Sequence, residues 1–196
     1  MGQLIFLALV TLTSLLASLS SNFSSALVFD RNAIFDGEIW RIITGHLVHF
    51  STTHLTFNLF AFLVLGYVME NKKYPNPYIF YFSLSMIISI CLLIFKPHMN
   101  YYGGLSGIAY GILYYCALMG IKEARPWQTI CLFAVFFVPI KIAVEIYINA
   151  SPLPSGSGKL FIPMQTSHIS GCLVAIIFYL IGNRNKSSIA KAYRDM

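Results

Sequence analysis

Two polar side chains that could form a nucleophile and its base head two of the chain's apolar segments. Ser106 lies in the stretch Gly-Gly-Leu-Ser-Gly at 103–107, and His168 lies in Ser-His-Ile-Ser-Gly at 167–171. Reactive polar groups at membrane depth are costly, so they point first to function. A hydroxyl that meets an imidazole can serve as an activated nucleophile. The helices that carry Ser106 and His168 decide whether the two meet.

The composition indicates an integral membrane protein. Of 196 residues, 57% are hydrophobic and 10% are charged, and the mean hydropathy is +0.71. Soluble domains carry about 25% charged residues. A net charge of +6 would suggest nucleic acid in a soluble chain, but here its distribution indicates membrane topology. We therefore expect a lipid bilayer as the environment and no nucleic-acid partner.

The apolar segments predict an all-α membrane protein, a single domain over 1–196. Each segment is close to the ~20 residues that cross a hydrocarbon core. Pro and Gly clusters separate them, including Pro75 with Pro77 and the run at 152–156. The six expected spans are 4–21, 53–70, 76–95, 104–120, 127–148 and 164–182.

The basic residues predict the orientation. Six spans place both termini on one side, and no Lys or Arg precedes the first apolar run, which argues for a retained span. Eight basic residues fall on the side of the termini and four on the other, so the termini are expected to be cytoplasmic. These two sets are Lys72, Lys73, Lys122, Arg125, Arg184, Lys186, Lys191 and Arg194, against Arg31, Arg41, Lys96 and Lys159.

Counting along parallel spans places the polar groups at one depth. Ser106 precedes Gly120 by 14 residues, and His168 precedes Gly182 by the same 14. At 1.5 Å per residue, both lie about 21 Å above the inner boundary. His54 and Asn58, which are i and i+4 on one helix face, bracket that level at about 24 and 18 Å.

Small residues would allow the helices to approach closely. Gly107 and Gly111 form a small-xxx-small face, as do Ser167 and Gly171. Gly103 and Gly104 allow a loop to enter membrane depth where protein covers it. The helix that starts there would leave free N–H groups around Ser106.

These residues resemble the rhomboid intramembrane serine proteases. Trp40-Arg41, His49, His54, Asn58, Gly66 and Glu70 are similar to the family's second-span signature. Gly104-Leu105-Ser106-Gly107 with Tyr110 resembles its nucleophile motif, and His168 with Gly171 its general-base motif. The resemblance covers residues 40 to 182 in order and spacing.

The resemblance implies a six-helix rhomboid-like bundle and a serine endopeptidase without cofactor. It implies Ser106 as nucleophile and His168 as base, a dyad without a carboxylate, with Tyr110 packed on the imidazole. His54, Asn58 and the Ser106 N–H would form the oxyanion site, supported by Gly104 and Gly107. It implies a bacterial inner-membrane protein whose active site opens to the periplasm.

The substrate expected from the resemblance is a transmembrane segment of a membrane-anchored protein. The sequence of the segment from Arg41 to His49 is similar to that of rhombosortases. These are paired with exported proteins that carry a C-terminal Gly-Gly motif, a span and a basic tail. A general bacterial rhomboid protease is the alternative. A second alternative is a non-catalytic rhomboid-like protein that binds client helices. A transporter is disfavoured because the polar residues form one layer that does not cross the bilayer.

Other polar residues have structural interpretations. His46, His49 and His54 lack the spacing of an H-E-x-x-H metal pair, so no metal is expected and His49 is expected to tie down the long loop from 22 to 52. Lys141 and Glu145 are expected to form an i, i+4 ion pair facing protein, or to shape a lateral opening. Glu70 is expected to cap or pair locally. The four cysteines, Cys91, Cys116, Cys131 and Cys172, are expected to be reduced.

Overall fold

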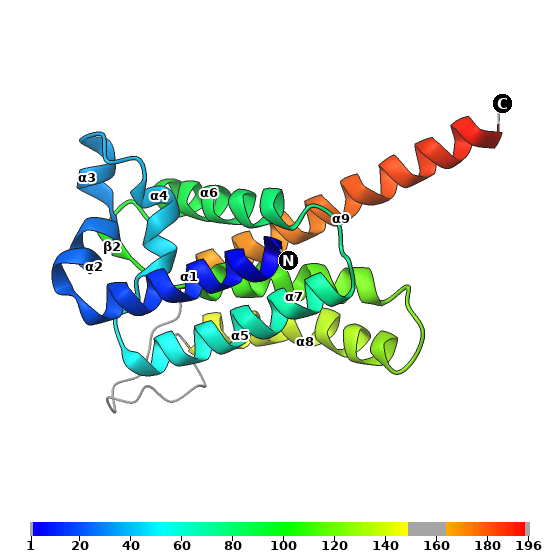
Figure 1. Cartoon of the computed structure of the whole chain (residues 1–196), viewed down its shortest axis with the longest axis horizontal. Coiled ribbons are helices and arrows are strands. Elements are labelled where there is room, and N and C mark those ends of the chain that lie inside the picture. The colour runs from blue at the N-terminus through cyan, green and yellow to red at the C-terminus, as the bar shows by residue number, and fades with distance from the viewer. Residues whose placement is uncertain (1, 149–163, 195–196) are drawn as a thin grey trace.

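The chain folds as an all-α bundle, as the sequence predicts (Figure 1). In this computed structural model, residues 2–148 and 164–194 are described, with side chains up to 183. Five described helices are long and apolar enough to cross a membrane, and a sixth apolar helix is shorter. The six are α1 (Gly2–Leu19), α5 (Thr52–Asn71), α6 (Pro77–Phe95), α7 (Ser106–Gly120), α8 (Trp127–Ile148) and α9 (Gln165–Arg194).

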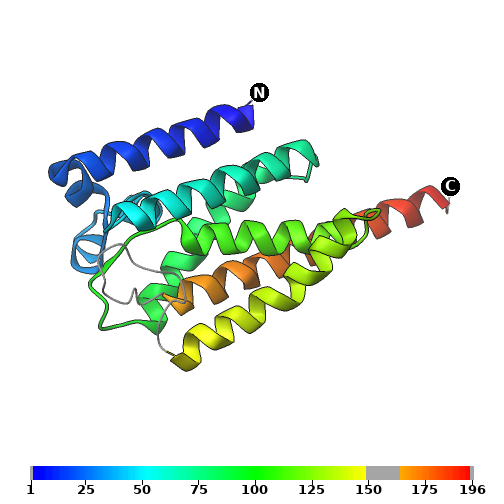
Figure 2. The same ribbon diagram turned by 90° about the horizontal axis from the view of Figure 1, so that it is seen from below.

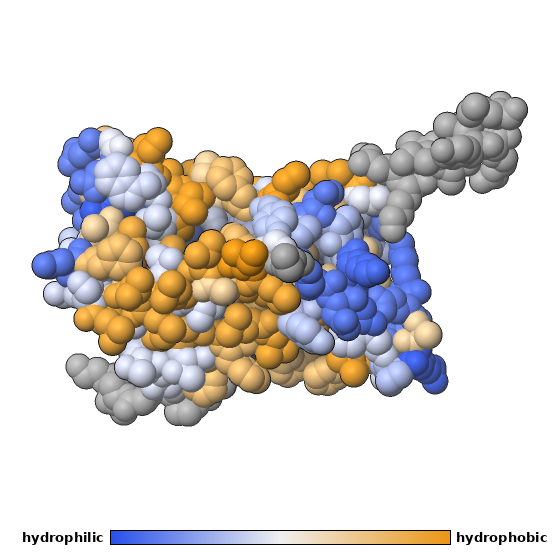
Figure 3. All heavy atoms as spheres, in the orientation of Figure 1, coloured by the Kyte–Doolittle hydropathy of each residue, from blue (hydrophilic) through white to orange (hydrophobic). Residues whose placement is uncertain are grey.

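The outer surface of the bundle is apolar across its middle. Figure 3 shows a hydrophobic band over the helices, with hydrophilic residues gathered toward both ends. Large side chains such as Phe60, Phe133 and Phe136 lie exposed on this surface. A contiguous apolar surface of this extent needs lipid around it. The protein is therefore an integral, multi-pass membrane protein.

Helix α7 is the core of the bundle. It contacts α5, α6, α8 and α9, and Figure 2 shows it between α5 and α9. Its 15 residues span about 22 Å, less than the ~30 Å hydrocarbon core. Because protein surrounds its start, a helix this short can begin inside the membrane, which agrees with the depth expected for Ser106.

The residues from 20 to 51, which we call the outer segment, fold into a series of short elements. They form α2 (Ser21–Leu27), β1 (Phe29–Asp30), α3 (Arg31–Phe35), α4 (Arg41–Thr44) and the 3-10 helix η1 (Gly45–Leu47). Strand β1 pairs antiparallel with β2 (Tyr101–Tyr102). The outer segment is thus tied to the chain that leads into α7.

Arg41 organises the outer segment from within. Its guanidinium is buried, donates to the carbonyls of Ser25 at 2.7 Å and Val28 at 2.9 Å, and pairs with Glu38. Trp40, half exposed, donates to the Ala26 carbonyl. Arg41 and Trp40 therefore hold the outer segment together, while the Trp40 ring stays half exposed.

The two ends of the bundle differ. The start of α1 and the α5–α6 and α7–α8 connections lie at one end, and the outer segment lies at the other (Figure 1). Helix α9 continues to Arg194, beyond the expected span end at 182, because no helix breaker interrupts the polar run that follows. The expected break at 152–156 and Lys159 lie outside the described residues.

Candidate active site

The structure brings the serine and the histidine into contact. Ser106 is the first residue of α7, and His168 lies near the start of α9. Ser106 Oγ and His168 Nε2 are 3.2 Å apart, a hydrogen-bonding distance for a nucleophile and its base. His168 is 4% exposed. The shared depth that residue counting predicts is therefore confirmed.

Close packing of α7 and α9 makes this contact possible. A Cβ on Gly171 would lie 2.2 Å from the Gly107 carbonyl oxygen, and one on Gly111 would lie 3.0 Å from the Gly171 oxygen. A Cβ on Gly107 would lie 3.0 Å from Ser167. The predicted small-xxx-small faces do meet, and only glycine at 171 allows the backbones to come so near.

Tyr110 packs on the imidazole. Its ring is stacked on that of His168, with centroids 4.0 Å apart and planes 15° apart. Residues i and i+4 share a helix face, so Tyr110 lies on the same side of α7 as Ser106. The stack fixes the plane of the imidazole, and the two ring nitrogens can still form hydrogen bonds at the edge of the ring.

Gly104 brings His54 and Asn58 next to the loop that precedes Ser106. Its φ is +128°, a conformation that favours glycine. A Cβ there would lie 2.6 Å from His54 Cε1 and 3.6 Å from Asn58 Nδ2. The Asn58 Nδ2 is buried and has no hydrogen-bond acceptor among the described residues. His54 and Asn58 thus lie beside the loop that leads into Ser106.

His49 is a neighbour of the site whose position the sequence does not reveal. Its Nδ1 donates to the Leu47 carbonyl at 3.2 Å, and its Nε2 accepts from the backbone N–H of Leu105 at 3.4 Å. Its ring packs edge-on against His54, 5.1 Å away. His49 therefore ties the outer segment to the residue before Ser106, more specifically than the loop-fixing role expected.

His46 is a buried structural histidine. Its Nε2 lies 3.1 Å from both the Ser85 carbonyl oxygen and Ser89 Oγ on α6. Burial lowers the pKa of His46 to about 4, and burial, with the neighbouring His54, lowers that of His49 to about 3. Both imidazoles are neutral at physiological pH and serve as fixed hydrogen-bonding groups.

Glu145 departs from the carboxylate-free dyad that the resemblance implies. The expected ion pair between Lys141 and Glu145 forms on α8. However, Glu145 also places Oε2 3.1 Å from His168 Nδ1 and is 1% exposed. The i, i+4 spacing reveals the ion pair, but not which face α8 turns to α9, because α8 is apolar on all sides.

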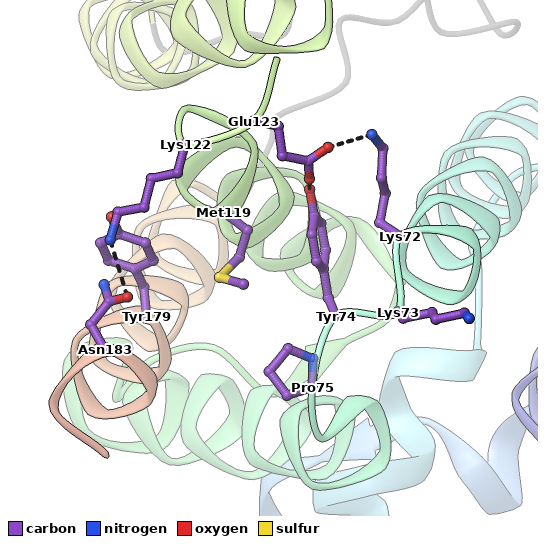
Figure 4. A pocket seen from close by; sticks show the side chains of 9 residues that line it. All are labelled: Lys72, Lys73, Tyr74, Pro75, Met119, Lys122, Glu123, Tyr179 and Asn183. Carbon is purple, nitrogen blue, oxygen red and sulfur yellow. Dashed lines mark hydrogen bonds and ion pairs between the residues drawn. The ribbon is translucent and has the colours of Figure 1, made fainter. Parts of the chain in front are cut away.

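A second polar cluster lies at the opposite end of the bundle (Figure 4). It lines a cavity of about 290 Å³. Glu123 pairs with Lys72 and accepts a hydrogen bond from Tyr74 at 2.6 Å, so Lys72 has a partner other than the nearby Glu70. Burial opposes ionisation, but the bonds from Lys72 and Tyr74 hold the pKa of Glu123 below its ordinary value. This cluster joins the two connections at that end and is remote from Ser106.

Comparison with known proteins agrees with the motifs. The Rhomboid domain family model matches residues 36–185, most of the chain and all of the residues placed around Ser106. The matched range includes the outer segment from Asp36 onward and ends just past Gly182. The resemblance first drawn from separate motifs therefore extends over a continuous domain.

Two relatives are themselves named as proteases. The rhomboid protease GlpG of Enterobacter sp. (strain 638) is 33% identical over 89 residues, which are 44% of this chain and 31% of the relative. The rhomboid protease GlpG of Haemophilus influenzae is 28% identical over 154 residues, 76% of this chain and 72% of the relative. The domain match and the contact between serine and histidine agree: this chain belongs to the rhomboid family of intramembrane serine proteases.

Proposed function

We propose that Ser106 and His168 are the catalytic residues, and that they hydrolyse a peptide bond in or beside a substrate's transmembrane segment. The observation that carries this proposal is the 3.2 Å contact between Ser106 Oγ and His168 Nε2. The imidazole is held in plane by Tyr110 and sheltered from solvent. A serine that only packs helices together would need none of these features.

The reaction follows from these positions. Ser106 Oγ forms a bond to the scissile carbonyl carbon while its proton passes to His168 Nε2. The C–N bond then breaks, and His168 returns the proton to the leaving nitrogen. Water, deprotonated by His168, attacks the Ser106 ester and releases the acid, which restores the serine hydroxyl.

The oxyanion that forms on the carbonyl needs donors aimed at it. Under this proposal, Asn58 Nδ2, His54 and the N–H of Ser106 provide them. Two observations support this role. The Nδ2 group is buried with no acceptor among the described residues, and the lack of a side chain at Gly104 lets the loop before Ser106 pack directly on His54 and Asn58.

For the substrate, we propose the rhombosortase type, an exported protein with a C-terminal Gly-Gly motif, a span and a basic tail. The similarity of the segment from Arg41 to His49 supports it. That segment folds as α4 and η1 and ends at His49, which contacts Leu105. Small residues before a span suit a protease that needs an unwound peptide, because glycine weakens a helix. A general rhomboid substrate is the alternative.

We also propose that the protein lies in a bacterial inner membrane, with both termini cytoplasmic and the site toward the periplasm. The distribution of Lys and Arg supports this orientation. The site and the outer segment lie at the end of the bundle opposite the lysine-rich cavity of Figure 4.

The direct test is cleavage in proteoliposomes of a membrane-anchored reporter, with Gly-Gly before its span. We expect Ser106→Ala to abolish cleavage. Ser170→Ala, which changes another buried serine whose hydroxyl donates to the Thr166 carbonyl, should keep it. Cleavage by Ser106→Ala at the wild-type rate would refute the proposed nucleophile. Replacing Gly-Gly in the reporter by Leu-Leu should stop cleavage if the rhombosortase assignment holds, and equal cleavage would favour a general rhomboid substrate.

A further inference from the structure

His168 has a separate partner for each of its ring nitrogens. Nε2 faces Ser106 Oγ at 3.2 Å, and Nδ1 faces Glu145 Oε2 at 3.1 Å. The three groups come from three helices, α7, α9 and α8. The resulting line from hydroxyl to imidazole to carboxylate runs through the interior, since His168 and Glu145 are almost completely buried.

The carboxylate fixes the tautomer of the imidazole. An ionised carboxylate only accepts hydrogen bonds, so Nδ1 of His168 must carry the proton that bonds to it. Nε2 is then left without a proton, and it can accept the one from Ser106. A base in the opposite tautomer could not do so, which is why the orientation of a catalytic histidine depends on its second nitrogen.

Lys141 keeps Glu145 ionised inside the protein. A buried, unpaired carboxylate would be costly and would tend to take up a proton. The Lys141 ammonium pairs with Oε1 of Glu145, and the Tyr110 hydroxyl is its other partner. Because Tyr110 stacks on His168, the four side chains form a closed ring that holds both the edge and the face of the imidazole.

A purely structural ion pair would not require this arrangement. An i, i+4 pair on a helix satisfies itself by contact between its own two side chains. Here the second carboxylate oxygen is directed at His168 instead. The Gln165 side chain also donates to the Glu145 backbone carbonyl at 3.3 Å, which joins α8 to the start of α9 beside the histidine.

We infer that Glu145 is a positioning residue of the active site, and that Ser106, His168 and Glu145 act as a triad whose carboxylate is neutralised by Lys141. This inference rests on the proposed roles of Ser106 and His168. In the triad, Glu145 orients the imidazole and stabilises the imidazolium that forms when Ser106 gives up its proton. Lys141 limits that stabilisation, so His168 can still release the proton to the leaving group.

The test compares Glu145→Gln and Glu145→Asp in proteoliposomes with a cleavable reporter, using Glu123→Gln as the matched control. Glu123 is also a lysine-paired carboxylate, but lies at the opposite end of the bundle. We expect Glu145→Gln to lower kcat at least about tenfold with KM within about twofold. Glu145→Asp should restore part of kcat, and Glu123→Gln should leave it unchanged.

The pH profile separates positioning from folding. With a neutral amide at 145, the imidazolium loses its carboxylate partner, so the acid limb of kcat should move to lower pH. The groups that face the imidazole are Ser106, Tyr110, Lys141, Glu145 and the nearby His54. The inference is overturned if Glu145→Gln keeps the wild-type kcat and acid limb. An active Ser106→Ala variant would instead refute the proposed function.

Discussion

At the scale of single residues, the candidate site is a set of hydrogen-bonding groups gathered around Ser106 and His168. Ser106 and His168 could be placed side by side from the sequence because equal spacing to the inner boundary fixes their depth, whereas the position of Tyr110 on the imidazole is predicted only by the resemblance. Glu145 and His49 could not be placed in this way. Their contacts with His168 and Leu105 depend on how α8 rotates about its axis and how the outer segment folds, and neither leaves a periodic signal.

The Asn58 amide gives a prediction at this scale. Replacing Asn58 with Ala should lower kcat by about 10² to 10³, because one preorganised donor to the oxyanion is lost. KM should change little, since the donor acts mainly in the transition state. Steady-state cleavage of the reporter measures both constants.

The matched control is Asn71→Ala, at the far end of the same helix α5. Equal kcat for Asn58→Ala and wild type would remove Asn58 from the oxyanion site.

At the scale of elements, α7 and α9 must stay in backbone contact for Ser106 to reach His168. The sequence shows which faces can approach, because small residues recur at i and i+4. It does not show that short helices form the outer segment. That feature depends on burial of Arg41 and His46 and on pairing of β1 with β2, which are tertiary contacts between residues far apart in sequence.

Gly171 tests the packing of these two helices. Gly171→Ala should cost about 1–3 kcal/mol of unfolding free energy and reduce kcat, because its Cβ would lie 2.2 Å from the Gly107 oxygen and push α9 away. Gly182→Ala is the control on the same helix. It has nothing within 4 Å and should stabilise slightly, since alanine favours a helix. Indistinguishable stability and activity of the two variants would contradict the close-packing account.

The histidines of the outer segment predict an acid-sensitive fold. Burial holds the pKa of His46 at about 4 and of His49 at about 3, against an ordinary value of 6.5. Below pH 6.5 the unfolded chain binds more protons than the folded one, so stability falls as the pH drops toward those values. At pH 5.5 each histidine should cost about 1 kcal/mol.

Unfolding in detergent at pH 7.5 and 5.5 measures this loss. The variant His98→Gln, which removes an exposed histidine, should show the same loss as wild type. A stability that does not change over this range would show that His46 and His49 are not held neutral by the fold.

At the scale of the whole molecule, a lipid-facing band separates two polar ends with different tasks. The end that carries the outer segment holds the candidate site, and the other end is tied together by Lys72, Tyr74 and Glu123. The all-α class and the membrane location could be predicted because composition and span length decide them. The extension of α9 beyond 182 could not be predicted, because hydropathy indicates where an apolar span leaves the membrane and not where the helix ends.

Cysteine labelling in spheroplasts tests the proposed orientation. The exposed side chains Asp36 and Lys73 lie at the outer end and the opposite end of the bundle. A membrane-impermeant maleimide should label Asp36→Cys in intact spheroplasts and Lys73→Cys only after lysis. Labelling of Lys73→Cys alone in intact spheroplasts would contradict the proposed topology and support the opposite orientation.

The most direct test of the central claim is covalent capture of the nucleophile by a fluorophosphonate, which reacts with activated serines. Mass spectrometry of the labelled protein in detergent should find the adduct on Ser106. The variant His168→Ala should lose labelling although Ser106 is still present, because the hydroxyl then lacks its base. An adduct on another serine, or labelling of Ser106 at an unchanged rate in His168→Ala, would contradict the proposed pairing of Ser106 and His168.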